Sequence, residues 1–393
     1  MTPMRKPAFF QHHGWSIGLS SVFLAGLVTI QADQARPSPQ ASPTPLPGPA
    51  VPIPLSRVKP DATIAVATGF SMTVTTDGVW LTDRAKQTIT RIDPKTNAPA
   101  ATIALDGPPC GAALAAFKTL WVAICGRETI ARVRLPPASS ATPSPTPATA
   151  PSPTPGTPPA STPLPSAKPA PAATPAPPAT TALPAPGKPI MIETPGGAAG
   201  LLATGAGSVW SVIATTGTIA RIDPDTNAVV AEVSVLAGAN AMTFANDALW
   251  LVSTPKGVLT RVNGHTNVVT KSIPVGKSPV AVAAGAGSVW VLNAGDGTVS
   301  RLDPATDKVT ETIKLGTAGQ ASQAGAIVFA EGSLWLSVPG TPLARIDPAS
   351  NRVVQRFTGT AGGSLAAGLR SLWLAVSPTE LWRIDPKRVE ATR

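Results

Sequence analysis

A tryptophan recurs along this chain at a nearly constant interval, and this recurrence limits the possible folds more than any other feature. The consecutive spacings are 41, 89, 40, 40, 45 and 38 residues, and the value of 89 contains an insertion. An arginine follows each tryptophan by ten or eleven residues. We assign a structural role in every unit to these residues: Trp80, Trp121, Trp210, Trp250, Trp290, Trp335 and Trp373, with Arg91, Arg132, Arg221, Arg261, Arg301, Arg345 and Arg383.

The unit at residues 288–316 reads as three short strands separated by turns, and a small apolar strand at 280–284 precedes it. The run from Ser288 to Leu292 is rich in strand-forming residues. Gly295 and Pro304 mark the turns. Four short antiparallel strands repeating every 40 residues or so are typical of propeller blades. We therefore predict an all-β fold, a seven-bladed β-propeller of four-stranded antiparallel blades.

The two ends of the repeat array are incomplete in a complementary way. Residues 61–67 resemble the outermost strand of a blade without its first three strands, and the last unit stops after Pro386 without a convincing fourth strand. We predict that Thr63 to Val66 supplies the outer strand of the last blade. This pairing closes the ring and removes open sheet edges.

The repeated motif is Ser or Ala, Val or Leu, Trp, then Val or Leu, followed by Thr-x-x-Arg-Ile/Leu-Asp-Pro. In this motif the chain resembles the YVTN-type seven-bladed propellers, and more loosely the NHL and virginiamycin B lyase propellers. The resemblance runs from about residue 61 to the C-terminus, without the insertion. It implies an architecture but little chemistry, because one fold supports many functions.

Three segments outside the repeats have a different composition. Residues 1–35 carry Arg5 and Lys6 ahead of an apolar run, which indicates a signal peptide or, as the alternative, an uncleaved membrane anchor. Residues 36–60 are a Pro-rich linker, and residues 136–188 are a disordered Pro/Ala/Thr/Ser-rich insertion in blade 2 of the 61–393 propeller. The linker and the insertion both join the ring at the end opposite the predicted channel mouth. We expect an extracytoplasmic protein, secreted or anchored at the cell surface.

Cys110 and Cys125 flank the predicted turn at Phe117-Lys118 symmetrically. In an antiparallel hairpin about that turn the two side chains face each other. An exported chain meets an oxidising compartment, so we predict a disulfide between them. A loop of this length stabilises a fold by about 3 kcal/mol in the chain-entropy model.

The formal net charge of +10 raises the question of a nucleic-acid partner. Seven of the basic residues are the repeat arginines, and the chain contains no tyrosine and no aromatic-basic cluster. We therefore expect no nucleic-acid partner. We expect a monomer without a cofactor or a metal site, and a protein or cell-wall component as the partner.

Ligands of propellers gather at the channel mouth, which is formed by the loops between second and third strands and by the blade-to-blade loops. The charged and polar residues of these loops are the ligand-binding candidates. The most favoured pairs are Asp83-Arg84 and Arg127-Glu128, which lie on adjacent blades. The candidates are Asp83, Arg84, Arg127, Glu128, Lys256, Asn293 and Asp296, and the same loops contain Lys86, Asp106, Glu193 and Lys277. The competing interpretation is that these are solvated loop charges. Arg301 and Asp303, two apart on one strand, should pair locally and hold their turn.

Two classes of function fit the sequence. The first is an exported, non-enzymatic recognition or scaffold module at the cell envelope. The second is a lyase or hydrolase resembling the virginiamycin B lyases, which use a histidine, a glutamate and a divalent metal. The only histidine of the repeats is His265, and it belongs to an outer turn away from the predicted mouth. A quinone-dependent dehydrogenase ranks third, and the sequence favours binding over catalysis.

Overall fold

The computed structural model describes residues 50–67, 69–135, 188–213, 216–316, 324–360 and 362–390. The predicted signal or anchor, residues 36–49 of the linker and residues 136–187 of the insertion lie outside the described residues. Within the described ranges, no helix has the length and apolar character needed to cross a membrane.

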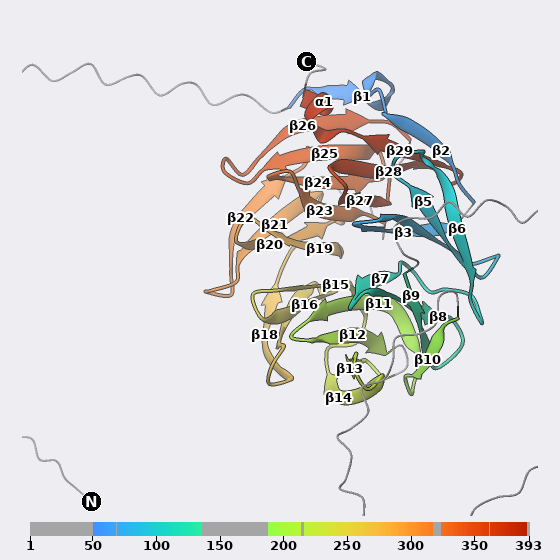
Figure 1. Cartoon of the computed structure of the whole chain (residues 1–393). Coiled ribbons are helices and arrows are strands. Elements are labelled where there is room, and N and C mark those ends of the chain that lie inside the picture. The colour runs from blue at the N-terminus through green and yellow to red at the C-terminus, as the bar shows by residue number, and fades with distance from the viewer. Residues whose placement is uncertain are drawn as a thin grey trace, which may run out of the picture. The chain divides into compact units, whose positions relative to one another are not determined.

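Seven antiparallel sheets follow one another along the chain (Figure 1). Blade 1 consists of β3 (Phe70–Thr75), β4 (Gly78–Asp83), β5 (Thr88–Asp93) and β6 (Ala98–Ala104). Blade 2 consists of β7 (Leu114–Ala116), β8 (Thr119–Ile124), β9 (Thr129–Arg134) and β10 (Ile190–Glu193). Blade 3 consists of β11 (Ala198–Gly205), β12 (Ser208–Ile213), β13 (Thr218–Asp223) and β14 (Ala228–Ser234). Blade 4 consists of β15 (Ala239–Ala245), β16 (Ala248–Ser253), β17 (Val258–Asn263) and β18 (Val268–Pro274).

The remaining blades involve both ends of the described chain. Blade 5 consists of β19 (Pro279–Gly285), β20 (Ser288–Asn293), β21 (Thr298–Asp303) and β22 (Lys308–Lys314). Blade 6 consists of β23 (Ala326–Ala330), β24 (Ser333–Val338), β25 (Thr341–Asp347) and β26 (Arg352–Thr358), with β1 (Pro52–Pro54) added in parallel at its edge. Blade 7 consists of β27 (Leu365–Gly368), β28 (Ser371–Ser377), β29 (Glu380–Ile384) and β2 (Ala62–Ala65). The predicted seven-bladed propeller is therefore confirmed.

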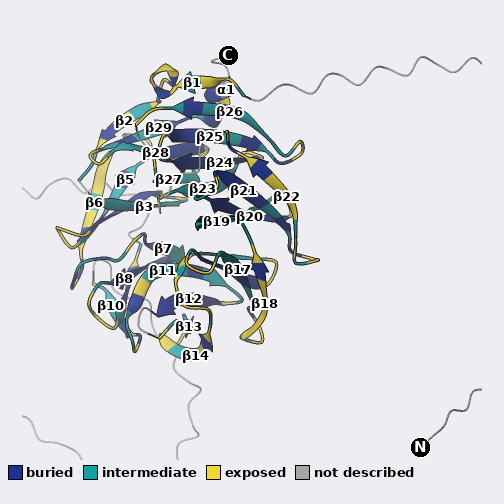
Figure 2. Ribbon diagram, turned by 180° about the vertical axis from the view of Figure 1, so that it is seen from behind, coloured by how far each residue is buried: buried dark blue, intermediate teal, exposed yellow. Residues whose placement is uncertain are grey.

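The first strands of neighbouring blades contact each other in a closed order, from β3 through β7, β11, β15, β19, β23 and β27 back to β3. Within each blade, the second strand is the most buried one (Figure 2). Every residue of β4 is buried, whereas β6 of the same blade buries only Ile103. The blades approach closely: a Cβ atom on Gly285 in blade 5 would lie 2.0 Å from the ring of Phe329 in blade 6. Only a glycine permits this contact.

The ring closes as the sequence predicts. β2 pairs antiparallel with β29, from Ala62 opposite Arg383 to Ala65 opposite Glu380. The N–H of Asp61 extends the pairing by donating to the carbonyl of Arg383 at 2.8 Å. Beginning and end of the ring are thus held in one sheet, which leaves no open edge at the junction.

Part of the segment that the sequence assigned to the linker is folded. After β1, the 3₁₀ turn η1 (Leu55–Arg57) turns the chain towards blade 7, and Leu55 and Val58 are buried beside Phe357. The short helix α1 (Pro386–Glu390) adds Val389 to the same cluster, and its carbonyl accepts a hydrogen bond from Gln355 Nε2 at 2.8 Å. The Pro-rich average composition of the linker does not reveal such a folded segment, because only three apolar side chains, Ile53, Leu55 and Val58, dock it on the ring.

Blades 2 to 7 each hold their arginine against their own tryptophan. In the described chain, six of the seven arginines lie over the tryptophan ring of their own blade, with distances of 4.8 to 5.5 Å from Cζ to the ring centroid. The tryptophan indole N–H of these six blades donates to the carbonyl five residues earlier, as Trp290 does to Gly285 at 2.9 Å. In five of these six blades the arginine Nε donates to a hydroxyl at the start of the second strand, as Arg301 does to Ser288 at 2.9 Å.

The arginine then reaches into the next blade. Arg301 Nη1 in blade 5 donates to the carbonyl of Pro348 at 2.8 Å and to Asn351 Oδ1 at 2.7 Å, both in the β25–β26 turn of blade 6. The same contact joins four other pairs of blades: Arg132 with Asn227, Arg221 with Asn267, Arg261 with Asp307 and Arg383 with Asn97. We call this contact the arginine latch. The prediction of a purely local Arg-Asp pair is wrong for these blades, because the long side chain carries the guanidinium past its own turn.

In five of the repeats an aspartate two residues after the arginine caps its own turn instead. Asp303 Oδ1 accepts the N–H of Ala305 at 2.9 Å, and its Oδ2 accepts the Thr306 hydroxyl at 2.9 Å. The last turn residue, Asp307, has a positive φ of 56°, a conformation that Asn and Asp tolerate well. One short turn therefore supplies both its own cap and the acceptor for the arginine of the preceding blade.

We predict that Arg301→Lys lowers the free energy of unfolding by about 1.5–3 kcal/mol, because a lysine loses the simultaneous contacts to Ser288, Pro348 and Asn351. Urea denaturation measures the change. Arg84→Lys makes the same exchange at an exposed loop position and should change stability by less than about 0.5 kcal/mol. Equal effects of the two exchanges would contradict the latch.

We predict that Val58→Ala destabilises the fold by about 1.5 kcal/mol, whereas Val51→Ala has little effect. The two exchanges remove the same atoms, but Val58 is 5% exposed and Val51 is 77% exposed. Thermal unfolding of the two variants measures the difference. If both variants match the wild type, residues 50–60 do not belong to the folded ring.

The turn caps predict a dependence on acid pH. A backbone hydrogen bond lowers the pKa of Asp93 and of Asp303, and the Ser350 hydroxyl lowers the pKa of Asp347. A lowered carboxyl pKa favours the folded state above the unfolded-state value, so this stabilisation is present above about pH 4 and is lost as the pH falls through the folded-state pKa.

Asp303→Asn should reduce the loss of stability on acidification, since the amide oxygen still accepts the N–H of Ala305 without titrating, while the Thr306 hydroxyl loses its acceptor at every pH. Blade 4 already uses this solution: Asn263 Oδ1 accepts the N–H groups of His265 and Thr266, both at 2.9 Å. The reverse exchange, Asn263→Asp, should increase the acid dependence. Urea midpoints at neutral and acid pH test both, and parallel pH profiles for all three proteins would exclude the explanation.

Candidate functional site

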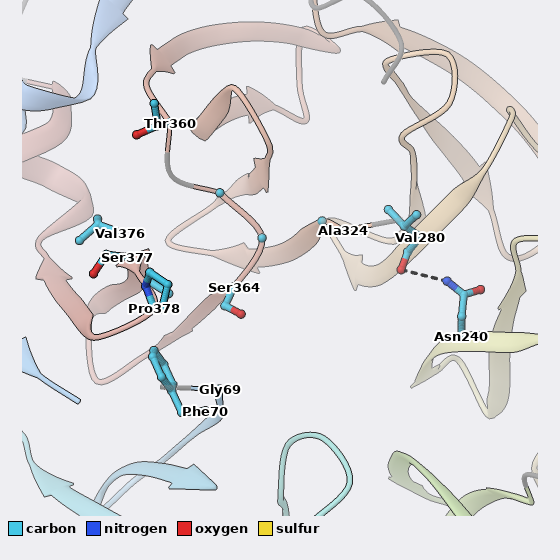
Figure 3. A pocket seen from close by; sticks show the side chains of 14 residues that line it. Gly69, Phe70, Asn240, Val280, Ala324, Thr360, Ser364, Val376, Ser377 and Pro378 are labelled. Carbon is cyan, nitrogen blue, oxygen red and sulfur yellow. Dashed lines mark hydrogen bonds between the residues drawn. The ribbon is translucent and has the colours of Figure 1, made fainter. Parts of the chain in front are cut away.

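A cavity at the predicted channel mouth has a volume of about 850 Å³. It lies where the first strands of several blades begin, and five blades contribute to its wall (Figure 3). Blade 1 contributes Phe70, blade 4 Asn240, blade 5 Val280 and blade 6 Gly325. The chain between blades 6 and 7 contributes Thr360 and residues 362–364 before β27, and blade 7 contributes residues 375–378 around the β28–β29 turn. We call this cavity the mouth pocket.

Local backbone requirements shape the wall of the mouth pocket on the side of blade 7. Gly362 and Gly363 have φ values of 148° and 126°, and a Cβ atom on Gly362 would lie 2.4 Å from the carbonyl oxygen of Val338. A side chain there is excluded by conformation and by space. The N–H of Gly363 donates to Ser337 Oγ at 3.0 Å, which ties this loop to blade 6.

Asn240 connects three strands at the edge of the pocket. Its Nδ2 donates to the carbonyls of Pro279 and Val280, each at 3.4 Å, and its Oδ1 accepts the N–H of Thr254 at 3.1 Å. Figure 3 shows the contact with Val280. Asn240 therefore positions the wall between blades 4 and 5.

The described lining of the mouth pocket contains no charged side chain. Its polar side chains are the hydroxyls of Thr360, Ser364 and Ser377 and the amide of Asn240. Phe70 supplies one aromatic ring. Such a wall can bind a ligand by neutral hydrogen bonds and by contact with a flat apolar face.

None of the seven predicted candidates lines the described part of this pocket. Asp83 lines a different cavity of about 480 Å³ between blades 7 and 1, together with Lys86 and Phe70. Its Oδ1 accepts the N–H of Lys86 at 2.9 Å, so Asp83 caps the β4–β5 turn. Phe70 lines both cavities.

The favoured cluster does not form an ion-pair network: in the described part of the chain, no ion pair joins Asp83-Arg84 to Arg127-Glu128. Arg84, Arg127 and Lys256 are exposed. Glu128 Oε1 accepts the N–H of Gly196 at 3.0 Å and thereby fastens the connection between blades 2 and 3. A ligand role for these residues stays a prediction.

Asn293 and Asp296 organise the loop of blade 5. Asn293 is fully buried, and its Nδ2 donates to Thr298 Oγ1 at 3.1 Å and to Ser300 Oγ at 2.9 Å. Asp296 accepts the Thr298 hydroxyl at 2.8 Å and the N–H of Lys277 at 3.0 Å. These contacts give both residues a role in holding the blade-to-blade loop.

The predicted disulfide between Cys110 and Cys125 is present. Its geometry follows from the hairpin about Phe117-Lys118, extended by backbone bonds from Cys110 to Ala123 at 2.8 Å and from Cys125 to Pro108 at 2.7 Å. The disulfide therefore fixes the start of blade 2 at the mouth end of the ring.

His265 lies in the β17–β18 turn, as predicted, and its Nε2 is 3.5 Å from Asp247 Oδ1. Both side chains are mostly exposed. The β17–β18 turn with His265 and the β15–β16 turn with Asp247 both lie at the end of the ring opposite the mouth pocket. Among the residues that the structure describes, no group of three or more His, Cys, Asp or Glu side chains could hold a metal ion.

Sequence reasoning missed Phe70, Asn240, Ser364 and Ser377. They carry no charge, and charge was the signal used to choose candidates. The doublet Gly362-Gly363 just before a first strand was a usable signal, because adjacent glycines indicate a special backbone conformation at a close approach.

Seven four-stranded sheets in a closed ring define the class of this protein, a β-propeller. No family model and no curated protein sequence matches the chain. Among solved structures, the crystal structure of BamB from Moraxella catarrhalis is similar over 83% of this chain and 96% of that chain, with 12% identity and a TM-score of 0.53. This likeness shows the fold alone. A Kuenenia stuttgartiensis hydrazine synthase matches 44% of this chain and about half of its own length (54%), with 15% identity and a TM-score of 0.40.

Proposed function

We propose that this protein is an exported, non-enzymatic recognition or scaffold module of the cell envelope, and that its partner docks at the mouth pocket. The observation that carries the proposal is the pocket of about 850 Å³ to which five blades contribute uncharged side chains and glycines. Binding sites of similar volume are common for ligands of moderate size.

The lining favours a partner that presents uncharged hydrogen-bonding groups. Ser364, Ser377 and Thr360 offer hydroxyls that both donate and accept. Phe70 offers an apolar face. A neutral part of a cell-wall polymer or of an envelope protein has the complementary chemistry.

The disulfide supports export. Disulfides persist in oxidising compartments and are rare in the cytosol. The apolar run that follows Arg5 and Lys6 has the composition of a signal or anchor. Recovery of the intact disulfide-linked protein from the extracytoplasmic fraction of producing cells tests this part, whereas a reduced protein confined to the cytosol would contradict it.

We predict that Ser364→Trp and Ser377→Trp abolish retention of the protein on immobilised cell-envelope material, because each exchange fills the mouth pocket. Purified wall polymer and solubilised envelope proteins are immobilised separately to identify the class of partner. Ser272→Trp adds the same bulk at an exposed position of β18 and should leave retention unchanged. Thermal unfolding confirms that each variant is folded.

Retention of the two mouth variants at the wild-type level would refute docking at the mouth pocket. A separate assay addresses catalysis. Turnover of a macrocyclic lactone in the presence of magnesium, abolished by a chelator, would contradict the non-enzymatic proposal.

A further inference from the structure

A second cavity, of about 720 Å³, opens at the end of the ring opposite the mouth pocket. It lies among the turns that join the first and second strands of blades 7, 1 and 2. Its apolar wall includes Val74, Ala115, Leu135 and Leu369, and the ring of Phe117 stands at the rim with 38% of its surface exposed. We call it the turn pocket.

The ionisable side chains that line the described turn pocket are both cationic, Lys118 and Arg370, and both are exposed. The acidic residue of the neighbouring β3–β4 turn, Asp77, lies 3.3 Å from Arg91 and is committed to that ion pair. The rim therefore combines positive charge with an apolar interior.

The residues at the rim have a backbone conformation that does not suit them. Phe117 and Lys118 have φ values of 52° and 58°, and Leu369 and Arg370 both have 56°. This left-handed conformation costs an L-residue about 1–2 kcal/mol. The equivalent turns of the other blades with positive φ end in Gly207, Asp247, Gly287 and Gly332. Strained residues that persist at a pocket point to a functional use of their side chains.

We propose that the turn pocket binds an anionic amphiphile, an alkyl chain with a carboxylate or phosphate head group. The alkyl chain lies against Val74, Leu135 and Leu369, which removes apolar surface from water. The head group lies between Lys118 and Arg370, which donate charge-assisted hydrogen bonds to it. This proposal is independent of the proposed function at the mouth pocket.

The test measures binding of dodecanoate, below its micelle concentration, to the full-length protein by calorimetry. The double exchange Lys118→Gln with Arg370→Gln should weaken binding of dodecanoate by about tenfold or more, since both ionic hydrogen bonds are lost. Binding of the uncharged dodecyl maltoside should not change. The matched control is Lys271→Gln with Lys308→Gln, which removes two exposed charges from outer strands and should leave both affinities unchanged. All variants keep the same N-terminus, so any binding there is common to them.

A second variant separates binding from folding. Phe117→Asn with Lys118→Gly installs residues that tolerate the left-handed turn, so the melting temperature should rise while dodecanoate binding weakens, because one of the two cations is removed. Vesicles containing phosphatidylglycerol distinguish a bilayer source of the amphiphile from a monomeric one. Equal dodecanoate affinity of the wild type and both turn-pocket variants would overturn the proposal. Charge-dependent vesicle binding without dodecanoate binding would overturn it as well, because a flat surface contact would then replace the pocket.

Discussion

The contact of one arginine with its own tryptophan and with the next blade is the interaction on which the ring depends. A buried guanidinium is tolerable only when its donors are satisfied. Arg301 meets this condition through Ser288 in its own blade and through Pro348 and Asn351 in the next. Because the acceptors belong to two blades, the arginine can be satisfied only when the blades are correctly docked. The latch therefore makes the partial burial of the Arg301 guanidinium conditional on the assembly of the ring.

Blade 1 shows what happens when the parts of the latch are absent. Its second strand begins at Gly78, which has no hydroxyl, and the connection from β9 to β10 in blade 2 runs through residues outside the described ranges. Arg91 pairs with Asp77 instead, and the indole N–H of Trp80 and Nε of Arg91 have no hydrogen-bond partner among the described residues. The same blade borders both the mouth pocket and the turn pocket. The least regular blade thus lies next to the two cavities, which agrees with the general observation that local rules are broken near functional sites.

Most of the fold could be predicted from the repeated sequence unit. The interval between tryptophans, the Asp-Pro turns and the complementary ends predicted seven blades, the closure by Thr63 to Val66 and the Cys110–Cys125 disulfide. Two features were not predictable in this way. The docking of Leu55 and Val58 depends on a groove that exists only once blades 6 and 7 are packed. The direction in which a repeat arginine extends depends on which acceptor is nearer in space. For Arg261 that acceptor is Asp307, about 46 residues away along the chain.

The candidate site also divides into features that the sequence predicts and features that depend on the folded structure. Charged and polar loop residues stand out in the sequence, but Asn293, Asp296 and Glu128 form hydrogen bonds that hold their own loops. The wall of the mouth pocket consists mostly of small, apolar and hydroxyl side chains, and the turn pocket adds Lys118 and Arg370, which lie outside the loops from which the candidates were taken. The sequence by itself determined the number of blades, their strands and their closure, because these follow from a local pattern repeated at a constant interval. Only the tertiary structure decided which side chains surround a cavity, because that depends on how separate blades meet in space.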